Sequence, residues 1–323
     1  PLQKSDSKKI SLFTNVDEKC VFSIPDVNSI HSIPELLNSQ GLDKQITEKL
    51  RLKSKPANLN RWKKVSKLEK NRKGITKIAL VGKYTELADS YKSVNEALVH
   101  AGIHNKTEVE IEYFDSQNFN NGVKKFKPQG ILIPGGFGGR GIDGMINVAK
   151  FARTKNIPFF GICLGMQVAV IEFARNVLKI SANSTEFEKT TKHPVIALIT
   201  EWMDKKGLTQ IRSENSDKGG TMRLGSQVCI LEKNSKMSKM YGTRKISERH
   251  RHRYEFNSNY LRKIKSKGMN VVGFSEDKNL VEAIELKGHK WFVGCQFHPE
   301  FTSDPRTGHP LFNGFIRAAK VTK

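Results

Sequence analysis

A cysteine between two glycines is the first feature of this 323-residue chain with an evident chemical use. Cys163 stands in Gly-Ile-Cys-Leu-Gly, at residues 161–165, where an apolar run meets an amphipathic one. The glycines permit a sharp turn from a strand into a helix, and a helix N-terminus lowers the pKa of a thiol and offers N–H groups to an oxyanion. The pattern predicts a nucleophilic thiol. The alternative is a small buried cysteine in a tight turn.

A histidine and a glutamate form the second feature. His298 and Glu300 stand two residues apart after an apolar run, and Pro299 between them restricts the backbone. Side chains two apart on an extended segment lie on one face, so the carboxylate can orient the imidazole as a general base and then a general acid. Alone, the pair could be a surface histidine beside a surface glutamate. Together with the cysteine turn, it predicts a Cys-His-Glu triad.

Both features follow predicted strands of an α/β fold. From residue 75, apolar or alternating runs predict strands, and amphipathic stretches between them predict helices. The strands are expected at 76–84, 109–116, 130–134 and 157–162, and the helices at 88–103 and 144–156. This alternation predicts a doubly wound, mostly parallel sheet covered on both sides. Such sheets bind ligands at the carboxyl ends of their strands, where the glycine-rich segments 135–141 and 161–165 both fall.

The rest of the chain divides into an antiparallel part and an N-terminal appendage. Short β-rich runs predict an antiparallel extension, closed by a helix at 309–320; the runs are 193–200, 226–232, 270–275, 280–286 and 291–297. Residues 1–74 hold one helical stretch, 34–50, and too little apolar sequence for an independent core. We therefore expect the tail of a larger domain at 1–54, a linker at 55–74 and the α/β domain at 75–323. Because the chain starts at Pro1 without a methionine, we expect it to be part of a longer protein.

The composition excludes several classes of protein. Apolar runs are of strand length, well short of the roughly 20 residues of a membrane span, and the N-terminus resembles no secretory signal. The 4 cysteines are far apart, without the C-x-x-C pair of zinc or redox sites, which fits free thiols in a reducing cytosol. Cys20, Cys229 and Cys295 are expected to be structural.

A net charge of +23 leaves nucleic-acid binding open. Most of the positive charge comes from lysines that are spread along the chain, which favours the interpretation as an ordinary solvated surface. One basic cluster is dense, because residues 247–256 read Ser-Glu-Arg-His-Arg-His-Arg-Tyr-Glu-Phe and could contact phosphates. A basic nucleic-acid-binding module is therefore the alternative from a different class of function.

Longer motifs carry a resemblance to a known family. GICLGMQ with FHPEF resembles the triad-type, class I glutamine amidotransferases, in which a cysteine attacks the side-chain amide of glutamine and ammonia is released. The resemblance narrows to the CTP synthases through PGGFGGRG, ANSTEF, GGTMRLG, ERHRHRYE and CQFHPEFTSDPRTGHPLFNGF, over residues 75–320. Residues 8–60 are similar to the end of that family's amidoligase domain. The resemblance implies a flavodoxin-like α/β amidotransferase domain, preceded by a remnant of an α/β amidoligase domain.

The resemblance also implies roles for residues. Cys163 would be the nucleophile that forms a γ-glutamyl thioester, with His298 as base and Glu300 as its orienting acid. Oxyanion N–H groups would come from Gly136 and Leu164. Glutamine would be held by Gly136, Phe137, Leu164, Gln167, Glu186 and one arginine of the run 249–253, taken as Arg253. A carboxylate and a guanidinium suit a zwitterion, since arginine binds a carboxylate as a bidentate fork. From the residues alone, Phe137 could fill a loop, Gln167 could be an ordinary helix residue and Glu186 a cap.

The family's nucleotides give further expectations. Arg140, Gly141 and Asp143 correspond to the loop that binds the activator GTP, with Asp143 where a glutamate is expected. The full-length family enzyme aminates UTP to CTP with ATP, Mg²⁺ and ammonia from glutamine, and would be a cytoplasmic homotetramer assembled through its ligase domain.

The chain by itself is expected to do less than the full-length enzyme. The glutaminase half needs no cofactor, and no metal is expected in this chain. The sequence has no G-x-x-x-x-G-K-[ST] phosphate loop, so it is expected to carry out at most glutamine hydrolysis. The other enzyme interpretation is a class I amidotransferase or γ-glutamyl hydrolase serving another acceptor.

Overall fold

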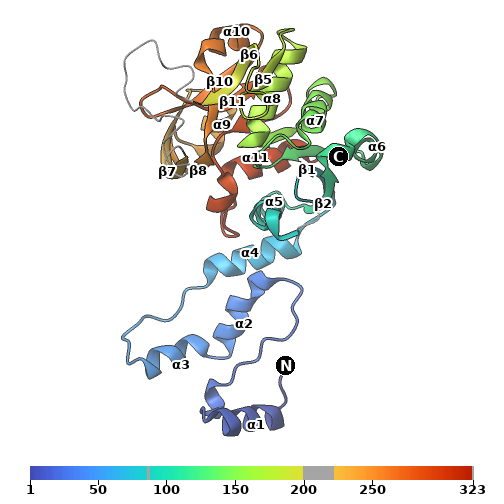
Figure 1. Ribbon diagram of the computed structural model, residues 1–323. Helices are drawn as coiled ribbons and strands as arrows, with labels where there is room; N and C mark the ends of the chain where they lie inside the picture. The colour runs from blue at the N-terminus through green and yellow to red at the C-terminus, as the bar shows by residue number, and fades with distance from the viewer. Residues whose placement is uncertain (86–87, 199–221, 322–323) are drawn as a thin grey trace. The chain divides into compact units, whose positions relative to one another are not determined.

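The computed structural model describes residues 1–85, 88–198 and 222–321 (Figure 1). The chain forms two compact units, Pro1–Arg72 and Lys73–Lys323. Two predicted features fall partly outside the described residues, namely the end of the strand predicted at 193–200 and the first residues of the GGTMRLG motif at 219–225.

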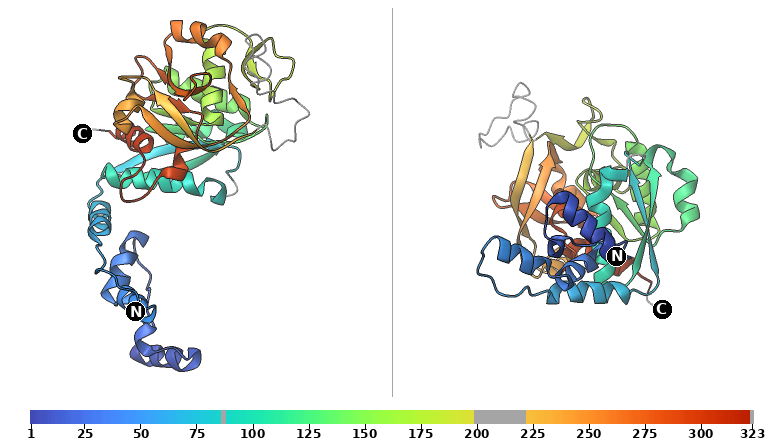
Figure 2. Two further views of the ribbon diagram at one scale, coloured as in Figure 1. Left: turned by 90° about the vertical axis from the view of Figure 1, so that its left-hand side faces the viewer. Right: turned by 90° about the horizontal axis from the view of Figure 1, so that it is seen from below.

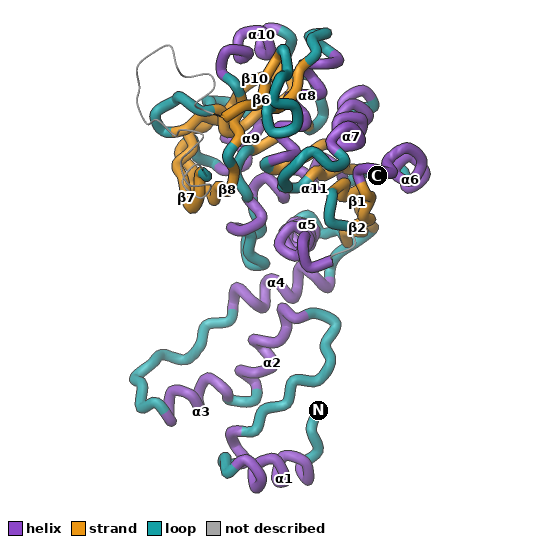
Figure 3. The backbone as a smooth tube through the Cα atoms, in the orientation of Figure 1, coloured by secondary structure: helices purple, strands orange, loops and turns teal. Residues whose placement is uncertain are grey.

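The first unit consists of helices and loops (Figure 3). Its elements are α1 Lys4–Thr14, η1 Glu18–Cys20, η2 Ile30–Ser32, α2 Ile33–Ser39, α3 Leu42–Lys49 and α4 Asn60–Lys70, where η marks a 3-10 helix. The helical stretch predicted at 34–50 is two helices, because Gly41 has a φ of 81° that ends the regular backbone. The predicted linker 55–74 contains α4. Phe13 is 86% exposed, as expected for a unit with little apolar sequence.

The second unit is built on a nine-stranded sheet, in the order β2-β1-β3-β4-β12-β11-β10-β7-β8. In this order, the first five strands, β2, β1, β3, β4 and β12, are parallel to one another. Each of the last four, β11, β10, β7 and β8, is antiparallel to the strand before it. Their bounds are β1 Ile75–Gly82, β2 Glu108–Asp115, β3 Gly130–Ile133, β4 Phe159–Ile162, β7 Arg223–Leu231, β8 Lys245–His252, β10 Met269–Ser275, β11 Val281–Leu286 and β12 Phe292–Cys295. This confirms the predicted mostly parallel sheet with an antiparallel extension, and the order β2-β1-β3-β4-β12 is flavodoxin-like.

Helices cover both faces of this sheet (Figures 1 and 2). One face packs α7 Ile142–Thr154 and α8 Leu164–Asn176, and the other packs α5 Lys92–His104 and α11 Pro310–Ala319. Successive residues of β1 therefore enter different cores, Ala79 with α7 and α8, and Ile78 with α5 and α11. Because both faces of the sheet are covered, β3 and β4 are buried along their whole length, and their sequences are continuous apolar runs.

A second sheet has the order β5-β6-β9. It contains β5 Ala182–Ser184, β6 His193–Leu198 and β9 Tyr254–Phe256, so the strand predicted at 193–200 lies here and not in the antiparallel extension. The remaining helices are η3 Ala88–Tyr91, η4 Ser116–Asn118, α6 Phe119–Phe126, α9 Lys236–Tyr241, η6 Ser258–Tyr260, α10 Leu261–Ser266 and η7 Pro299–Thr302. None of the helices described is long and apolar enough to cross a membrane.

The basic cluster at 247–256 forms most of β8 and all of β9. Along β8 exposed and buried residues alternate, with Arg249 and Arg251 exposed and His250 and His252 buried. This is the period of two expected for a strand with one face on the core. The cluster therefore presents fewer cationic groups on one surface than its sequence suggests.

Candidate active site

Three neighbouring parallel strands bring the predicted catalytic residues together. Cys163 directly follows β4, His298 follows β12, and the glycine-rich loop 135–141 follows β3. Strand β4 pairs in parallel with β12 on one side and with β3 on the other. The carboxyl ends of the three strands therefore meet at one edge of the sheet, where ligands of doubly wound sheets bind.

Cys163 occupies a strained turn between β4 and α8. Its φ is 52° and its ψ is −103°, and its side chain is buried, with 2% exposure of the residue. Few non-glycine residues adopt a positive φ, and such strain is found often at active sites. The two flanking glycines allow close packing, because a Cβ at Gly165 would lie 2.1 Å from the Ile133 carbonyl oxygen and one at Gly161 would lie 2.6 Å from the Gly165 carbonyl carbon.

His298 and Glu300 form a buried hydrogen-bonded pair. Nδ1 of His298 lies 2.7 Å from Oε1 of Glu300, and the side chains are only 11% and 6% exposed. Nε2 of His298 is also buried and has no hydrogen-bond partner among the described residues. The ring packs against the loop after β3, since a Cβ at Gly135 would lie 2.7 Å from Cε1 of His298 and 3.6 Å from Cβ of Cys163. The histidine, the cysteine and the loop thus meet around Gly135.

The electrostatics of this centre favour an ion pair. Burial lowers the pKa of His298, but the negative charge of a Cys163 thiolate and the Glu300 carboxylate outweigh burial and raise that pKa to about 10. An imidazolium beside a thiolate is the reactive form of a cysteine nucleophile. The arrangement can therefore attack a carbonyl carbon and protonate the leaving group.

The two predicted oxyanion residues lie side by side. A Cβ at Gly136 would lie 3.2 Å from Cδ2 of Leu164. Leu164 is the first residue of α8, whose opening N–H groups have no acceptor within the helix. The following N–H groups, of Met166 and Gln167, bond to the Cys163 carbonyl. The N-terminal turn of α8 thus offers both a helix dipole and an amide next to the cysteine.

A lysine that the sequence analysis did not single out supports the glycine-rich loop. Lys83 follows β1 and donates from Nζ to the carbonyl oxygens of Phe137, at 3.1 Å, and of Gly138. In return, the guanidinium of Arg140 donates to the Lys83 carbonyl. Burial is the main cause that lowers the pKa of Lys83 to about 8. The only available signal was the position of Lys83 at the end of a predicted strand.

Glu186 and Arg253, predicted to hold the glutamine, lie close enough to interact electrostatically. Oε1 of Glu186 accepts the N–H of Gly138 at 2.7 Å. Burial raises the pKa of Glu186, against the opposing effects of that N–H and of the charges of Lys83 and Arg253. Nε of Arg253 is buried without a hydrogen-bond partner in the described part of the chain. One carboxylate and one available guanidinium match the two charged ends of an amino acid.

Phe137 and Gln167, which were also predicted to bind glutamine, differ in their exposure to solvent. The Phe137 ring is exposed, at 42%, and the Arg251 guanidinium lies 5.8 Å from its centre. In contrast, Gln167 is only 3% exposed, and its Nε2 donates to the Tyr254 carbonyl at 3.0 Å and to Oε1 of Gln296 at 3.2 Å. The side chain of Gln167 is therefore bound within the protein. Gln296 in turn lies against Cys163. The sequence analysis did not single out Gln296, although this residue immediately precedes the FHPEF motif.

The predicted GTP residues lie at the N-terminus of α7. Gly141 caps this helix with a φ of 68°, and a Cβ there would lie 2.0 Å from Oγ of Ser116, so only glycine fits. The side chain of Asp143 is 88% exposed and lies 3.3 Å from Arg175. Arg140 reaches back to Lys83, so the same loop joins this region to the catalytic centre.

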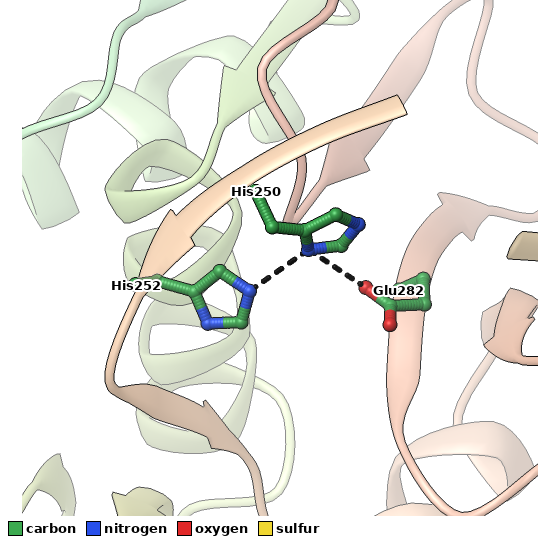
Figure 4. Close-up of side chains that lie close together, drawn as sticks. All are labelled: His250, His252 and Glu282. Atoms are coloured by element: carbon green, nitrogen blue, oxygen red, sulfur yellow. Dashed lines mark hydrogen bonds and ion pairs between the residues drawn. The ribbon is translucent and has the colours of Figure 1, made fainter. Parts of the chain in front are cut away.

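Among the described residues, one buried cluster has donor atoms close enough together to hold a metal ion. His250, His252 and Glu282 place nitrogen and oxygen atoms within 4.8 Å of one another (Figure 4). However, Oε1 of Glu282 lies 2.7 Å from the Arg223 guanidinium, and Nδ1 of His250 lies 2.9 Å from Nε2 of His252, a hydrogen-bond distance. Burial lowers the pKa of His250 to about 3, so the imidazoles are neutral and bond to each other. Since Mg²⁺ prefers oxygen ligands, this cluster does not fit the magnesium of an ATP-dependent step.

Comparisons with known proteins agree with this geometry. Residues 86–318 match the family described as Glutamine amidotransferase class-I, and residues 1–52 match the family described as CTP synthase N-terminus. Among solved structures, the chain is similar to the glutaminase domain of Trypanosoma brucei CTPS with bound acivicin, at 36% identity and a TM-score of 0.66. The alignment covers 76% of this chain and 93% of that chain.

Two more distant structures share less sequence. A putative GMP synthase component from Thermoplasma acidophilum is 16% identical, with a TM-score of 0.45 over 76% of this chain and 94% of that one. A glutamine amidotransferase from Thermotoga maritima is 13% identical, with a TM-score of 0.42 over 76% of this chain and 96% of that one.

Proposed function

Because this chain belongs to the class I glutamine amidotransferases, and among them to the CTP synthases, we propose that it hydrolyses glutamine with Cys163 as the nucleophile. The observation that carries the proposal is the meeting of Cys163, His298 and the Gly135 loop at the ends of three adjacent strands. Hydrolysis of the side-chain amide would release ammonia for the amination of UTP in the full-length enzyme.

The first half of the reaction forms a thioester. The Cys163 thiolate attacks the side-chain carbonyl carbon of glutamine, and the carbonyl oxygen becomes an oxyanion near the amides of Gly136 and Leu164. When this intermediate collapses, the carbon–nitrogen bond breaks, and the nitrogen takes the proton of the His298 imidazolium and leaves as ammonia. Glu300 keeps the imidazole in place through Nδ1.

The second half regenerates the enzyme. His298, now neutral, takes a proton from water while the hydroxide adds to the thioester carbon. The carbon–sulfur bond then breaks, Cys163 returns as a thiolate beside the imidazolium, and the glutamate product loses its carboxyl proton to solvent. The proposed steps balance with glutamine and water as the only reactants.

The amino-acid end of the substrate would be held by charge. Glu186 would bind the α-amino group, and Arg253, with its unpartnered Nε, would bind the α-carboxylate. The exposed ring of Phe137 would cover the aliphatic part of the substrate. Nε2 of Gln167 bonds to Tyr254 and Gln296, so Gln167 would contact glutamine through its other atoms.

Glutamate release by the chain and by two cysteine variants tests the nucleophile. Cys163→Ala should release no glutamate, whereas Cys20→Ala, a control at a partly buried free cysteine of the first unit, should match the parent. Parent-like activity of Cys163→Ala would show that another group attacks glutamine. If the parent chain itself is inactive, the same comparison is made in the full-length enzyme, where loss with Cys163→Ala is again expected.

The nucleotide chemistry is proposed for the full-length enzyme. ATP, Mg²⁺ and UTP would bind in its amidoligase domain, through which it would assemble as a cytoplasmic homotetramer, and GTP would act near Arg140, Gly141 and Asp143. Conversion of UTP to CTP with glutamine as nitrogen source separates this proposal from an amidotransferase or γ-glutamyl hydrolase with another acceptor. Formation of glutamate without CTP in the presence of UTP, ATP and Mg²⁺ would favour the hydrolase.

A further inference from the structure

We propose that Gln296 is the hydrogen-bond donor that keeps Cys163 ionised, and that Gln167 fixes the direction in which Gln296 donates. The inference rests on the proposed function, because it assigns how the nucleophile of that reaction is kept reactive. It gives a role to two buried amides, Gln296 with 0% and Gln167 with 3% exposure, that the triad chemistry does not use.

The polarity of the two amides is set by one main-chain carbonyl. Tyr254 presents a carbonyl oxygen, which accepts only a donor, so the Gln167 atom 3.0 Å away must be Nε2. The same Nε2 lies 3.2 Å from Gln296, which must therefore present its oxygen to Gln167. The amide nitrogen of Gln296 then has to face the other way, and it lies 3.6 Å from Sγ of Cys163. An N–H is thereby directed at the sulfur.

The backbone fixes Gln296 as firmly as its side chain does. Its N–H donates to the Glu282 carbonyl at 2.8 Å, so the residue continues the pairing between β12 and β11. His298, two residues further along the chain, is held in the same way, by a 2.7 Å bond from its N–H to the Arg249 carbonyl. The donor to the sulfur and the imidazole thus come from one short segment with a rigid backbone.

A second contact of the sulfur acts in the opposite sense. Sγ of Cys163 lies 4.0 Å from the Arg251 carbonyl oxygen, which can only accept a hydrogen bond and so favours the thiol over the thiolate. The Gln296 N–H favours the thiolate, because hydrogen bonds to a charged acceptor stabilise the charged form. Without the Gln296 donor, the buried thiolate would be stabilised by the His298 imidazolium and the N-terminus of α8 alone.

The donor acts at two points of the reaction. A thiolate accepts hydrogen bonds strongly, whereas the sulfur of a thioester is neutral and a poor acceptor. The Gln296 bond therefore stabilises the enzyme before attack and again when the carbon–sulfur bond breaks and the thiolate leaves. Its loss should lower the fraction of ionised cysteine and slow the release of glutamate from the thioester.

Alkylation of Cys163 by iodoacetamide, followed over pH, tests the proposal directly. Only the thiolate reacts, and mass spectrometry of the peptide that contains Cys163 separates it from the other cysteines. The variants are Gln296→Met, which removes the donor at similar size, Gln296→Glu, which puts a carboxylate against the sulfur, and Gln167→Met, which releases the orientation of Gln296. Gln227→Met, on β7, is the control.

We expect the midpoint of the alkylation curve to rise by about one pH unit in Gln296→Met, which is about a ten-fold change in the ionisation constant of the thiol. Gln296→Glu should raise the midpoint further, Gln167→Met should raise it less, and Gln227→Met should leave it unchanged. Curves of a folded Gln296→Met or Gln296→Glu that coincide with the parent's would overturn the proposal. Circular dichroism identifies folded variants, and if both Gln296 variants unfold, the Gln167→Met curve decides.

The same variants separate this inference from the proposed function. If the midpoint shifts but no form of the enzyme hydrolyses glutamine, the thiolate donor stands and the glutaminase proposal fails. If the parent hydrolyses glutamine and the folded variants show unshifted alkylation, the glutaminase proposal stands and Gln296 has only a packing role.

Discussion

At the scale of single residues, the centre depends on charges that burial would suppress. His298 keeps a raised pKa because Glu300 and the Cys163 thiolate outweigh its burial. Burial alone would lower the pKa of His298, so its positive charge depends on these two partners. Removal of one member should change the protonation of the others.

Glu300→Gln tests this dependence. The amide can donate to Nδ1 of His298 and so favour the wrong tautomer, and it no longer supports the imidazolium. We expect kcat for glutamine hydrolysis to fall by about 10²- to 10⁴-fold, by analogy with the loss of an orienting carboxylate in a serine triad. The imidazolium should also be lost at a lower pH than in the parent, where it persists to about pH 10. A pH profile of kcat/KM measures both effects, and an unchanged alkaline limb would contradict the assignment.

The sequence predicted residues whose chemistry is local and missed those whose role depends on the fold. Cys163, His298 and Glu300 belong to short motifs, because a nucleophile needs a turn and a base needs an orienting group nearby in the chain. Lys83 acts on Phe137, 54 residues away, and no local spacing indicates that contact. Gln296 was within a quoted motif, but its amide polarity depends on the Tyr254 carbonyl, which only the folded chain brings close.

At the scale of elements, the loop after β3 connects substrate binding to the catalytic centre. Lys83 holds two of its carbonyls, and Glu186 holds the N–H of Gly138. These bonds orient the two peptide groups on either side of Gly138, in the same loop as the proposed oxyanion amide of Gly136. The loop is thus held in part by Lys83, whose pKa is lowered to about 8.

Lys83→Met should weaken this support. We expect kcat/KM for glutamine to fall about ten-fold or more at pH 7, since hydrogen bonds from a charged donor are lost. In the parent, activity should begin to decline above about pH 8, where Lys83 loses its proton, and the variant should lack this decline. Lys150→Met, at an exposed lysine of α7, is the control and should keep the parent profile. A decline of equal size in Lys83→Met would assign it to another group.

Through Lys83, a rise in pH should change the stability of the fold in the opposite direction to the activity. Its pKa is lowered in the folded chain, so between about pH 8 and pH 10.5 the unfolded chain binds more protons. Stability from this group therefore rises with pH over that window while activity falls. Urea unfolding of parent and variant across the window separates the two effects.

Some elements were predictable and others were not, for a physical reason. β3 and β4 are buried on both faces, so their sequences are continuous apolar runs and were predicted. β8 was missed because three of its four inward residues, Glu248, His250 and His252, are polar and hide the alternation, and the fourth is Ile246. A buried polar cluster can replace an apolar face, and a pattern based on hydrophobicity does not detect it.

At the scale of the whole molecule, one ion-pair network joins the two sheets of the second unit. Arg223 of β7 lies 2.7 Å from Glu282 of β11 in the large sheet and 3.2 Å from Glu255 of β9 in the small one. The side chains are 11%, 0% and 1% exposed, so water does not screen these charges. One guanidinium therefore contacts a carboxylate in each sheet.

Arg223→Met should therefore destabilise the fold strongly. Removing one partner of a buried ion pair costs about 3–5 kcal/mol, since both carboxylates would stay buried and lose the charge of the guanidinium. Arg244→Met, at an exposed arginine between β7 and β8, makes the same change in net charge and should cost less than about 1 kcal/mol. The free energy of unfolding, from urea titration of both variants, checks this. Equal effects of the two variants would show that total charge matters and the buried network does not.

The path of β8 has a consequence for how the sequence around this centre can evolve. The carbonyls of Arg249 and Arg251 contact the His298 amide and the Cys163 sulfur, and they belong to the main chain of the antiparallel half of the sheet. Any amino acid supplies a carbonyl, so substitutions at these outward positions leave both contacts in place as long as the strand keeps its course. Apart from Arg251, whose guanidinium lies by the Phe137 ring, the exposed face of β8 is thus free to diverge and acquire new surface partners, while the same strand continues to line the reaction centre.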